Sequence, residues 1–135
     1  MMTQTQTTPL QTLDLSAIIG RVQDEHNFDT DTLTTAETLY RQFLWLHRKY
    51  PNKNLVPPRL VDEVWHQHIL DSRKYEEDCQ SLFGSFMHHH PGLSDADKET
   101  GIWEETKTLY AKEFGTDLDA LGLDGALCKC HKCQK

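Results

Sequence analysis

The strongest constraint on the fold is a stripe of side chains in the middle of the chain that follows helical spacing. Its members are separated alternately by four and three residues, the spacing of the core-facing side of an α-helix. A half-buried β-strand would instead alternate every second residue. The centre of the stripe is polar, and burying polar groups costs free energy unless each finds a partner. The stripe consists of Val61, Trp65, His68, Ser72, Tyr75, Cys79, Leu82 and Phe86.

Helical periodicity continues on both sides of this stripe and predicts four helices in all. Either Thr30 or Asp31 can cap the second helix, and Ser94 with Asp97 resembles a capping box at the start of the fourth. Prolines and glycines mark the remaining ends. The predicted helices span residues 10–27, 30–50, 57–83 and 94–114.

The predicted fold class is therefore all-α, a small four-helix bundle-like domain. At 135 residues the chain is long enough for one core. We expect a disordered lead-in over residues 1–9, the helical domain over 10–115 and a flexible Cys/His tail over 116–135. Periodicity fades after residue 115, where short polar residues and glycines take over.

Charge and composition exclude several classes of partner. The chain has 21 acidic and 14 basic residues, a net charge of −7, and no basic stripe, which argues against nucleic acid. No apolar run approaches the roughly 18 residues of a membrane helix. The N-terminus lacks the pattern of a secretory signal, and four cysteines, three of them within the last eight residues, are not a disulfide framework. We expect a soluble, cytoplasmic protein.

Imidazole and thiol groups concentrate in residues 61–91, which makes this segment the place to look for chemistry. His66 and His68 lie about 200° apart around a regular helix, so they cannot bind one ion together. Asp62 lies four residues before His66 on the same face and can fix the tautomer of a metal-bound His66. A surface ion pair is the alternative.

A metal site here would draw on the histidine end or the cysteine end of the stripe. His68 and Cys79 are eleven residues apart, about 16 Å along an unbroken helix, so both bind one ion only if the helix bends. A site built from His68, Cys79 and one loop histidine such as His88, with Tyr75 or His66 as a further ligand, would suit zinc or iron. Free cysteine is commonly a small core residue, and we favour that role for Cys79.

The C-terminus carries a separate cluster of four soft ligands within six residues. Its spacing is too short to wrap the closed tetrahedron of a structural zinc site. Thiolates this dense suit Cu(I) or a weakly held zinc. A flexible, redox-sensitive tail without metal is the alternative. The cluster consists of Cys128, Cys130, His131 and Cys133.

The run LVPPRLVDEVWHQHILDSRKYEEDCQSLFGSFMHHHP closely resembles the shared block of the glycine-rich domain-containing protein-like family. The resemblance covers about residues 30–115 and carries no particular activity with it. Relatives usually have an aromatic residue where this chain has His90, so His90 is the least expected of the three adjacent histidines in a shared site. The matching features are Asp62, Trp65, His66, His68, Tyr75, Cys79, Gly84 and His88.

Two functions from different classes fit these observations. The first is a metal-binding helical protein with a histidine-centred site and a thiol-rich tail, holding zinc, iron or copper. The second is a non-catalytic interaction or regulatory module with a protein partner, whose polar stripe is structural. No nucleophile motif or phosphate loop is present, and the Glu-x-x-His pattern of di-iron bundles occurs once, at Glu63 and His66. An enzyme is not expected, and the sequence leaves the oligomeric state open.

Overall fold

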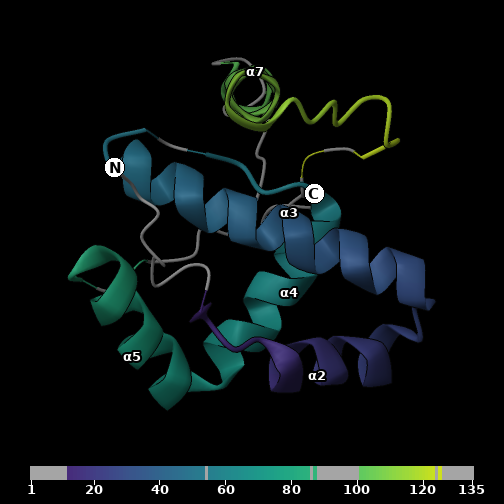
Figure 1. Ribbon diagram of the computed structural model, residues 1–135, viewed down its shortest axis with the longest axis vertical. Coiled ribbons are helices and arrows are strands. Elements are labelled where there is room, and N and C mark those ends of the chain that lie inside the picture. Colours follow the sequence, from purple (N-terminus) through teal and green to yellow (C-terminus); the bar gives the residue numbers. More distant parts are fainter. Residues whose placement is uncertain (1–11, 54, 86, 88–100, 124, 126–135) are drawn as a thin grey trace, which may run out of the picture.

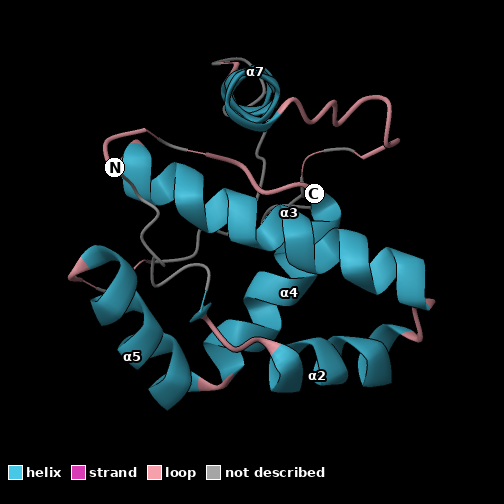
Figure 2. Ribbon diagram, in the orientation of Figure 1, coloured by secondary structure: helices cyan, strands magenta, loops and turns pink. Residues whose placement is uncertain are grey.

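A computed structural model describes residues 12–53, 55–85, 87, 101–123 and 125, in which five helices pack together (Figure 1). The predicted all-α class is confirmed. Within these described residues no strand forms, and the extended pairing present is an isolated bridge between Pro58 and Gly125 (Figure 2). None of the described helices is long and apolar enough to cross a bilayer.

The first described helix, α2 (Ser16–His26), begins later than the predicted start at residue 10. The Asp14 carboxylate accepts hydrogen bonds from the backbone N–H and the hydroxyl of Ser16, at 3.0 and 2.7 Å. Such local bonds compete with helix formation and favour a turn. The helix ends at Asn27, whose left-handed φ of 56° is tolerated well by asparagine.

Helix α3 (Thr30–Lys49) agrees closely with the prediction for residues 30–50, but its cap differs. The Asp29 carboxylate accepts a hydrogen bond from the Thr32 N–H at 2.8 Å. Asp29, not Thr30 or Asp31, is therefore the N-cap residue, one or two positions before the predicted caps.

The prediction of one long third helix is wrong. The helix is interrupted at Asp71, which separates α4 (Arg59–Leu70) from α5 (Ser72–Phe83). Asp71 has φ −88° and ψ 75°, outside the helical region. Its carboxylate accepts a hydrogen bond from Arg21 on α2 at 3.1 Å. The break lets α5 turn back and pack on α4, so the two halves of the stripe face each other.

The fourth predicted helix does not run continuously through Gly101, which has a left-handed φ of 75°. Helix α7 (Ile102–Phe114) starts directly after this glycine. The expected capping box at Ser94 and Asp97 lies outside the described residues. Beyond α7, Leu118 is 1% exposed and belongs to the core, so packing continues past residue 115.

The helices are arranged around α3 and α4, which pack extensively on each other, while α2 covers α4. In Figure 1, α7 lies at one end of the long axis of the molecule, and α2 with α5 lies towards the other end. Where α4, α5 and α3 meet, the core contains polar as well as apolar side chains. The largest fully buried side chains include Tyr40, Tyr75, Tyr110, Phe43, Leu15, Ile18 and His68.

Candidate functional site

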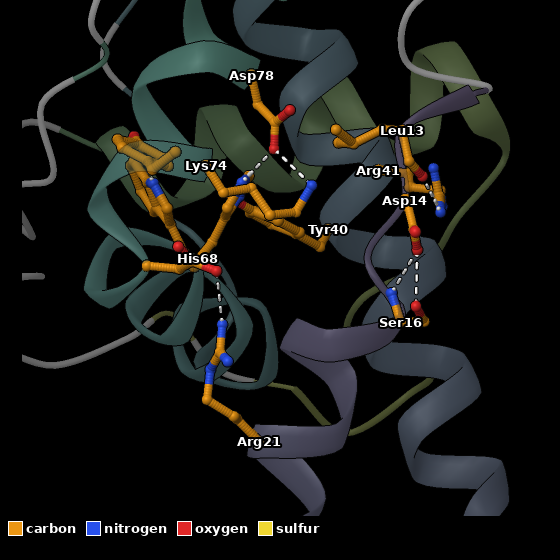
Figure 3. A network of polar contacts seen from close by, with 12 residues as sticks. Leu13, Asp14, Ser16, Arg21, Tyr40, Arg41, His68, Lys74 and Asp78 are labelled. Atoms are coloured by element: carbon orange, nitrogen blue, oxygen red, sulfur yellow. Dashed lines mark hydrogen bonds and ion pairs between the residues drawn. The ribbon is translucent and has the colours of Figure 1, made fainter.

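His68 is the centre of a buried polar network that joins three helices (Figure 3). Its ring is 1% exposed, and each of its nitrogens meets a side chain from another helix. On one side, Nδ1 lies 2.6 Å from the hydroxyl of Tyr40 on α3. On the other, Nε2 lies 2.8 Å from Oδ2 of Asp78 on α5, which also pairs with Lys74 at 3.1 Å.

The partners of His68 assign its tautomer. An ionised carboxylate only accepts hydrogen bonds, so Nε2 carries the hydrogen and donates it to Asp78. Nδ1 is then the bare nitrogen and accepts the hydroxyl hydrogen of Tyr40. Every polar atom of the ring therefore has a partner, as burial requires.

Burial sets the protonation of this network. It lowers the pKa of His68, although the hydrogen bond to Asp78 acts in the opposite direction. It raises the pKa of Tyr40 well above the ordinary value for a phenol. At neutral pH both rings are therefore uncharged, and the charges of the network reside on Asp78 and Lys74, nearer the surface.

A second branch continues from the ring of Tyr75, whose centroid lies 4.9 Å from that of His68 in an edge-on arrangement. The Tyr75 hydroxyl accepts a hydrogen bond from Trp65 Nε1 at 2.9 Å and donates one to the carbonyl of Met87. The Met87 backbone also bonds to the Cys79 thiol, whose pKa is nevertheless raised by burial. Cys79 is a buried thiol of the core, as expected, and not an activated thiolate.

The break at Asp71 makes the network possible. His68 and Asp78 are separated by ten residues, about 15 Å along a continuous helix, too far for a hydrogen bond. Trp65 and Tyr75 have the same separation and also bond. Folding back thus pairs two stripe members, Trp65 and Tyr75, and brings Asp78 from beside the stripe to His68. Ser72, at the start of α5, is exposed.

The structure separates the residues predicted to bind metal. Asp62 is half-buried and His66 is exposed on α4, whereas His68 and Cys79 are buried. Within the described part of the chain, no three His, Cys, Asp or Glu side chains are grouped as metal ligands. A metal at His68 would have to displace Tyr40 or Asp78.

The stripe member Phe86 lies outside the residues that the structure describes. Five candidate ligands also lie outside them, and their metal binding stays a prediction: His88, Cys128, Cys130, His131 and Cys133.

Sequence analysis did not predict Tyr40, Asp78 and Lys74 as members of the site. Tyr40 lies on α3, outside the segment rich in imidazole and thiol groups, and Asp78 lies off the stripe of a continuous helix. One signal was present: Asp71 and Ser72 follow the apolar end of α4, and both residue types favour helix starts. A helix start there would have placed Asp78 opposite His68.

Comparison with known proteins gives two matches. A family model described as UCP032817-like matches residues 10–103. Glycine-rich domain-containing protein 1 from Arabidopsis thaliana is 33% identical in an alignment of 91 residues that covers 58% of this chain and 11% of that protein. No solved structure matches the chain. The expected resemblance to glycine-rich domain-containing proteins is confirmed, although the chain corresponds to a small part of that relative.

Proposed function

The chain belongs to the UCP032817-like family, and from this premise we propose that it is a non-catalytic interaction module whose His/Tyr/Cys stripe is a structural polar network. The observation that carries the proposal is the pairing of both nitrogens of His68, with Tyr40 and with Asp78. A histidine bonded in this way has no open position for a metal or for a substrate. The proposed role of the network is to fix how α3, α4 and α5 pack.

Buried networks of this kind specify one arrangement because their bonds are directional. An apolar stripe tolerates a shift of one helix along another, but a shift here would break the bonds of His68. The branch from Trp65 through Tyr75 to Met87 adds two bonds that depend on the same geometry. The surface of the module would thus be held in a single shape for a partner.

Its relation to a longer protein supports the modular role. The matched part makes up 11% of the plant relative, so a similar stretch of sequence lies there within a much larger chain. We infer a protein partner, since the net charge of −7 disfavours a nucleic acid. A cytoplasmic location is part of the same proposal.

Metal analysis distinguishes the structural network from a metal centre. A chain shortened to residues 1–125, purified without an affinity tag or added metal, should contain no stoichiometric transition metal. Addition of a chelator should leave its thermal melt unchanged. The proposal would be overturned if wild type contained one equivalent of metal and His68→Leu lost both this metal and stability.

The interaction role is tested with a matched folding-defective variant. Trp65 is 3% exposed and bonded to Tyr75, so Trp65→Ala should lower the free energy of unfolding by about 3–5 kcal/mol. A partner recovered with wild type, absent with Trp65→Ala and bound again between purified components supports the role. Binding that Trp65→Ala retains in full would show that the folded helical unit is not the binding element.

Metal binding by the C-terminal cluster is a second proposal, supported by its composition alone. Three thiols and an imidazole within six residues suit Cu(I) or zinc, and this site would be independent of His68. Its ligands are Cys128, Cys130, His131 and Cys133.

A further inference from the structure

Three of the four tyrosines are fully buried, and they differ in the group that receives their hydroxyl hydrogen. Tyr110 donates to the carbonyl of Leu39 at 2.7 Å, and Tyr75 donates to the carbonyl of Met87. Amide carbonyls accept hydrogen bonds but are too weakly basic to take up a proton. Tyr40 instead donates to the bare nitrogen of an imidazole.

The fourth tyrosine, Tyr50, also faces a group that can be protonated, but a poorer base. Its hydroxyl donates to the Glu113 carboxylate, and this hydrogen bond, with that from Lys49, lowers the pKa of Glu113. A carboxylate is intrinsically a weaker base than imidazole. Tyr40 is therefore the tyrosine with the strongest proton acceptor.

This difference matters for oxidation. A phenol that loses an electron becomes a very strong acid, and the charged radical that would result is disfavoured in a low-dielectric core. Oxidation of a buried tyrosine is therefore easiest when a base takes the proton as the electron leaves. Nδ1 of His68, 2.6 Å from the hydroxyl of Tyr40, is placed to do this.

We propose that Tyr40 is a redox-active tyrosine whose one-electron oxidation is coupled to proton transfer to His68. The Tyr40 O–H bond breaks, the electron passes to an external one-electron oxidant, and the proton forms a new bond to Nδ1. The products are a neutral tyrosyl radical, an imidazolium and the reduced oxidant. On reduction of the radical, the proton returns from Nδ1 to the oxygen.

Two carboxylates near His68 favour the transient imidazolium. From α5, the Asp78 carboxylate accepts the Nε2–H bond in both states, and at the break Asp71 adds a favourable Coulombic influence. Burial of the ring, which packs edge-on against Tyr75, and the positive charge of Lys74 beside Asp78 act in the opposite direction. Asp78 is a positioning residue here. The activity goes beyond the proposed interaction role and does not depend on any partner.

The test uses the full chain and a photogenerated tris-bipyridine ruthenium(III) oxidant, with freeze-quenched electron paramagnetic resonance to detect tyrosyl radical. We expect a tyrosyl signal in wild type that is lost in Tyr40→Phe. The matched control is Tyr110→Phe, which removes an equally buried hydroxyl bonded to a carbonyl and should keep the signal. His68→Gln should slow formation of the radical by roughly a hundredfold, the usual contribution of a positioned base.

Circular dichroism of each variant verifies that it is folded, and Tyr40→Phe keeps the result decisive if His68→Gln unfolds. Absence of a tyrosyl signal in wild type would overturn the proposal. So would a signal of equal size in Tyr40→Phe, or equal loss of signal in both phenylalanine variants, since neither outcome singles out the tyrosine paired with imidazole.

Discussion

A histidine ring offers one donor and one acceptor when neutral, and His68 uses each towards a different helix. The arrangement leaves little tolerance for substitution, because removing the ring takes a hydrogen-bond partner away from two groups instead of one. The buried Tyr40 hydroxyl is affected more than Asp78, which keeps Lys74 and has 17% of its side chain exposed.

A double-mutant cycle measures the pairing of Tyr40 with His68. In His68→Leu the Tyr40 hydroxyl is buried without an acceptor, so the free energy of unfolding should fall by about 1–3 kcal/mol. Adding Tyr40→Phe removes the unpaired hydroxyl, so the double variant should be more stable than the sum of the single changes by about 1 kcal/mol. Urea unfolding measures all four proteins. Exposed Ser72→Ala, the control, should change stability by less than about 0.5 kcal/mol.

The pH dependence of stability follows from the lowered pKa of His68. In the unfolded chain this pKa returns to about 6.5. As the pH falls below that value, the unfolded state gains a proton that the folded state resists, so the contribution of His68 to stability declines until the lower folded pKa is passed. The difference in free energy of unfolding between wild type and His68→Leu, measured by urea unfolding, should therefore decrease as the pH is lowered from about 7.5 to 5. An advantage that widened on acidification would contradict the burial effect.

At the scale of the elements, two helices, α5 and α7, end at a glycine with positive φ. Gly115 closes α7 with φ 68°, whereas Gly20 lies exposed within α2 and has open space around its missing Cβ. The same substitution should therefore have opposite effects at the two positions, because only one of them has a backbone that an L-residue avoids.

We expect Gly115→Ala to lower the free energy of unfolding by about 1 kcal/mol, because alanine strains the left-handed cap. Gly20→Ala should raise it by about 0.5–1 kcal/mol, since alanine favours the helix and restricts the unfolded chain. Thermal unfolding of the two variants measures both effects. If both substitutions changed the free energy of unfolding in the same direction, one of the two backbone conformations would not be as described.

The helical class of the elements could be predicted from the sequence, but the turn at Asp71 between α4 and α5 could not. Helical spacing identified α3 almost to its ends, because its apolar face is broad and unbroken. The same spacing hid the break at Asp71, since the stripe continues in register across it and the apolar pattern alone favours one helix. Most of the site could not be predicted for a related reason. Asp78 reaches His68 only because the chain turns back at Asp71, and Tyr40 reaches it only through the packing of α3 on α4.

For the whole molecule, the question is how far the packed unit extends towards the C-terminus. Leu118 is 1% exposed, Leu123 packs against the core, and Gly125 forms its bridge with Pro58. The helical unit therefore holds the chain to at least this bridge, which lies beside the start of α4.

Truncation of the C-terminus and truncation of the buried Leu118 side chain should have very different effects on stability. Removing residues 126–135 should leave the melting temperature nearly unchanged, while lowering the capacity of the chain for Cu(I) or Zn(II). Leu118→Ala should lower the free energy of unfolding by about 2–5 kcal/mol, as a truncation of a buried leucine. Thermal melts with and without added metal test both. A large loss of metal-free stability on removal of residues 126–135 would contradict the first expectation.

The corner at Asp71 also has a consequence for how the chain folds. Two bonds of the network, from Trp65 to Tyr75 and between His68 and Asp78, each close over ten residues, whereas Tyr40 joins from 28 residues away. Short closures lose less chain entropy, so α4 and α5 can pair early in the transition state while Tyr40 docks late. Asp78→Asn should then mainly slow refolding, and Tyr40→Phe should mainly speed unfolding, in stopped-flow kinetics.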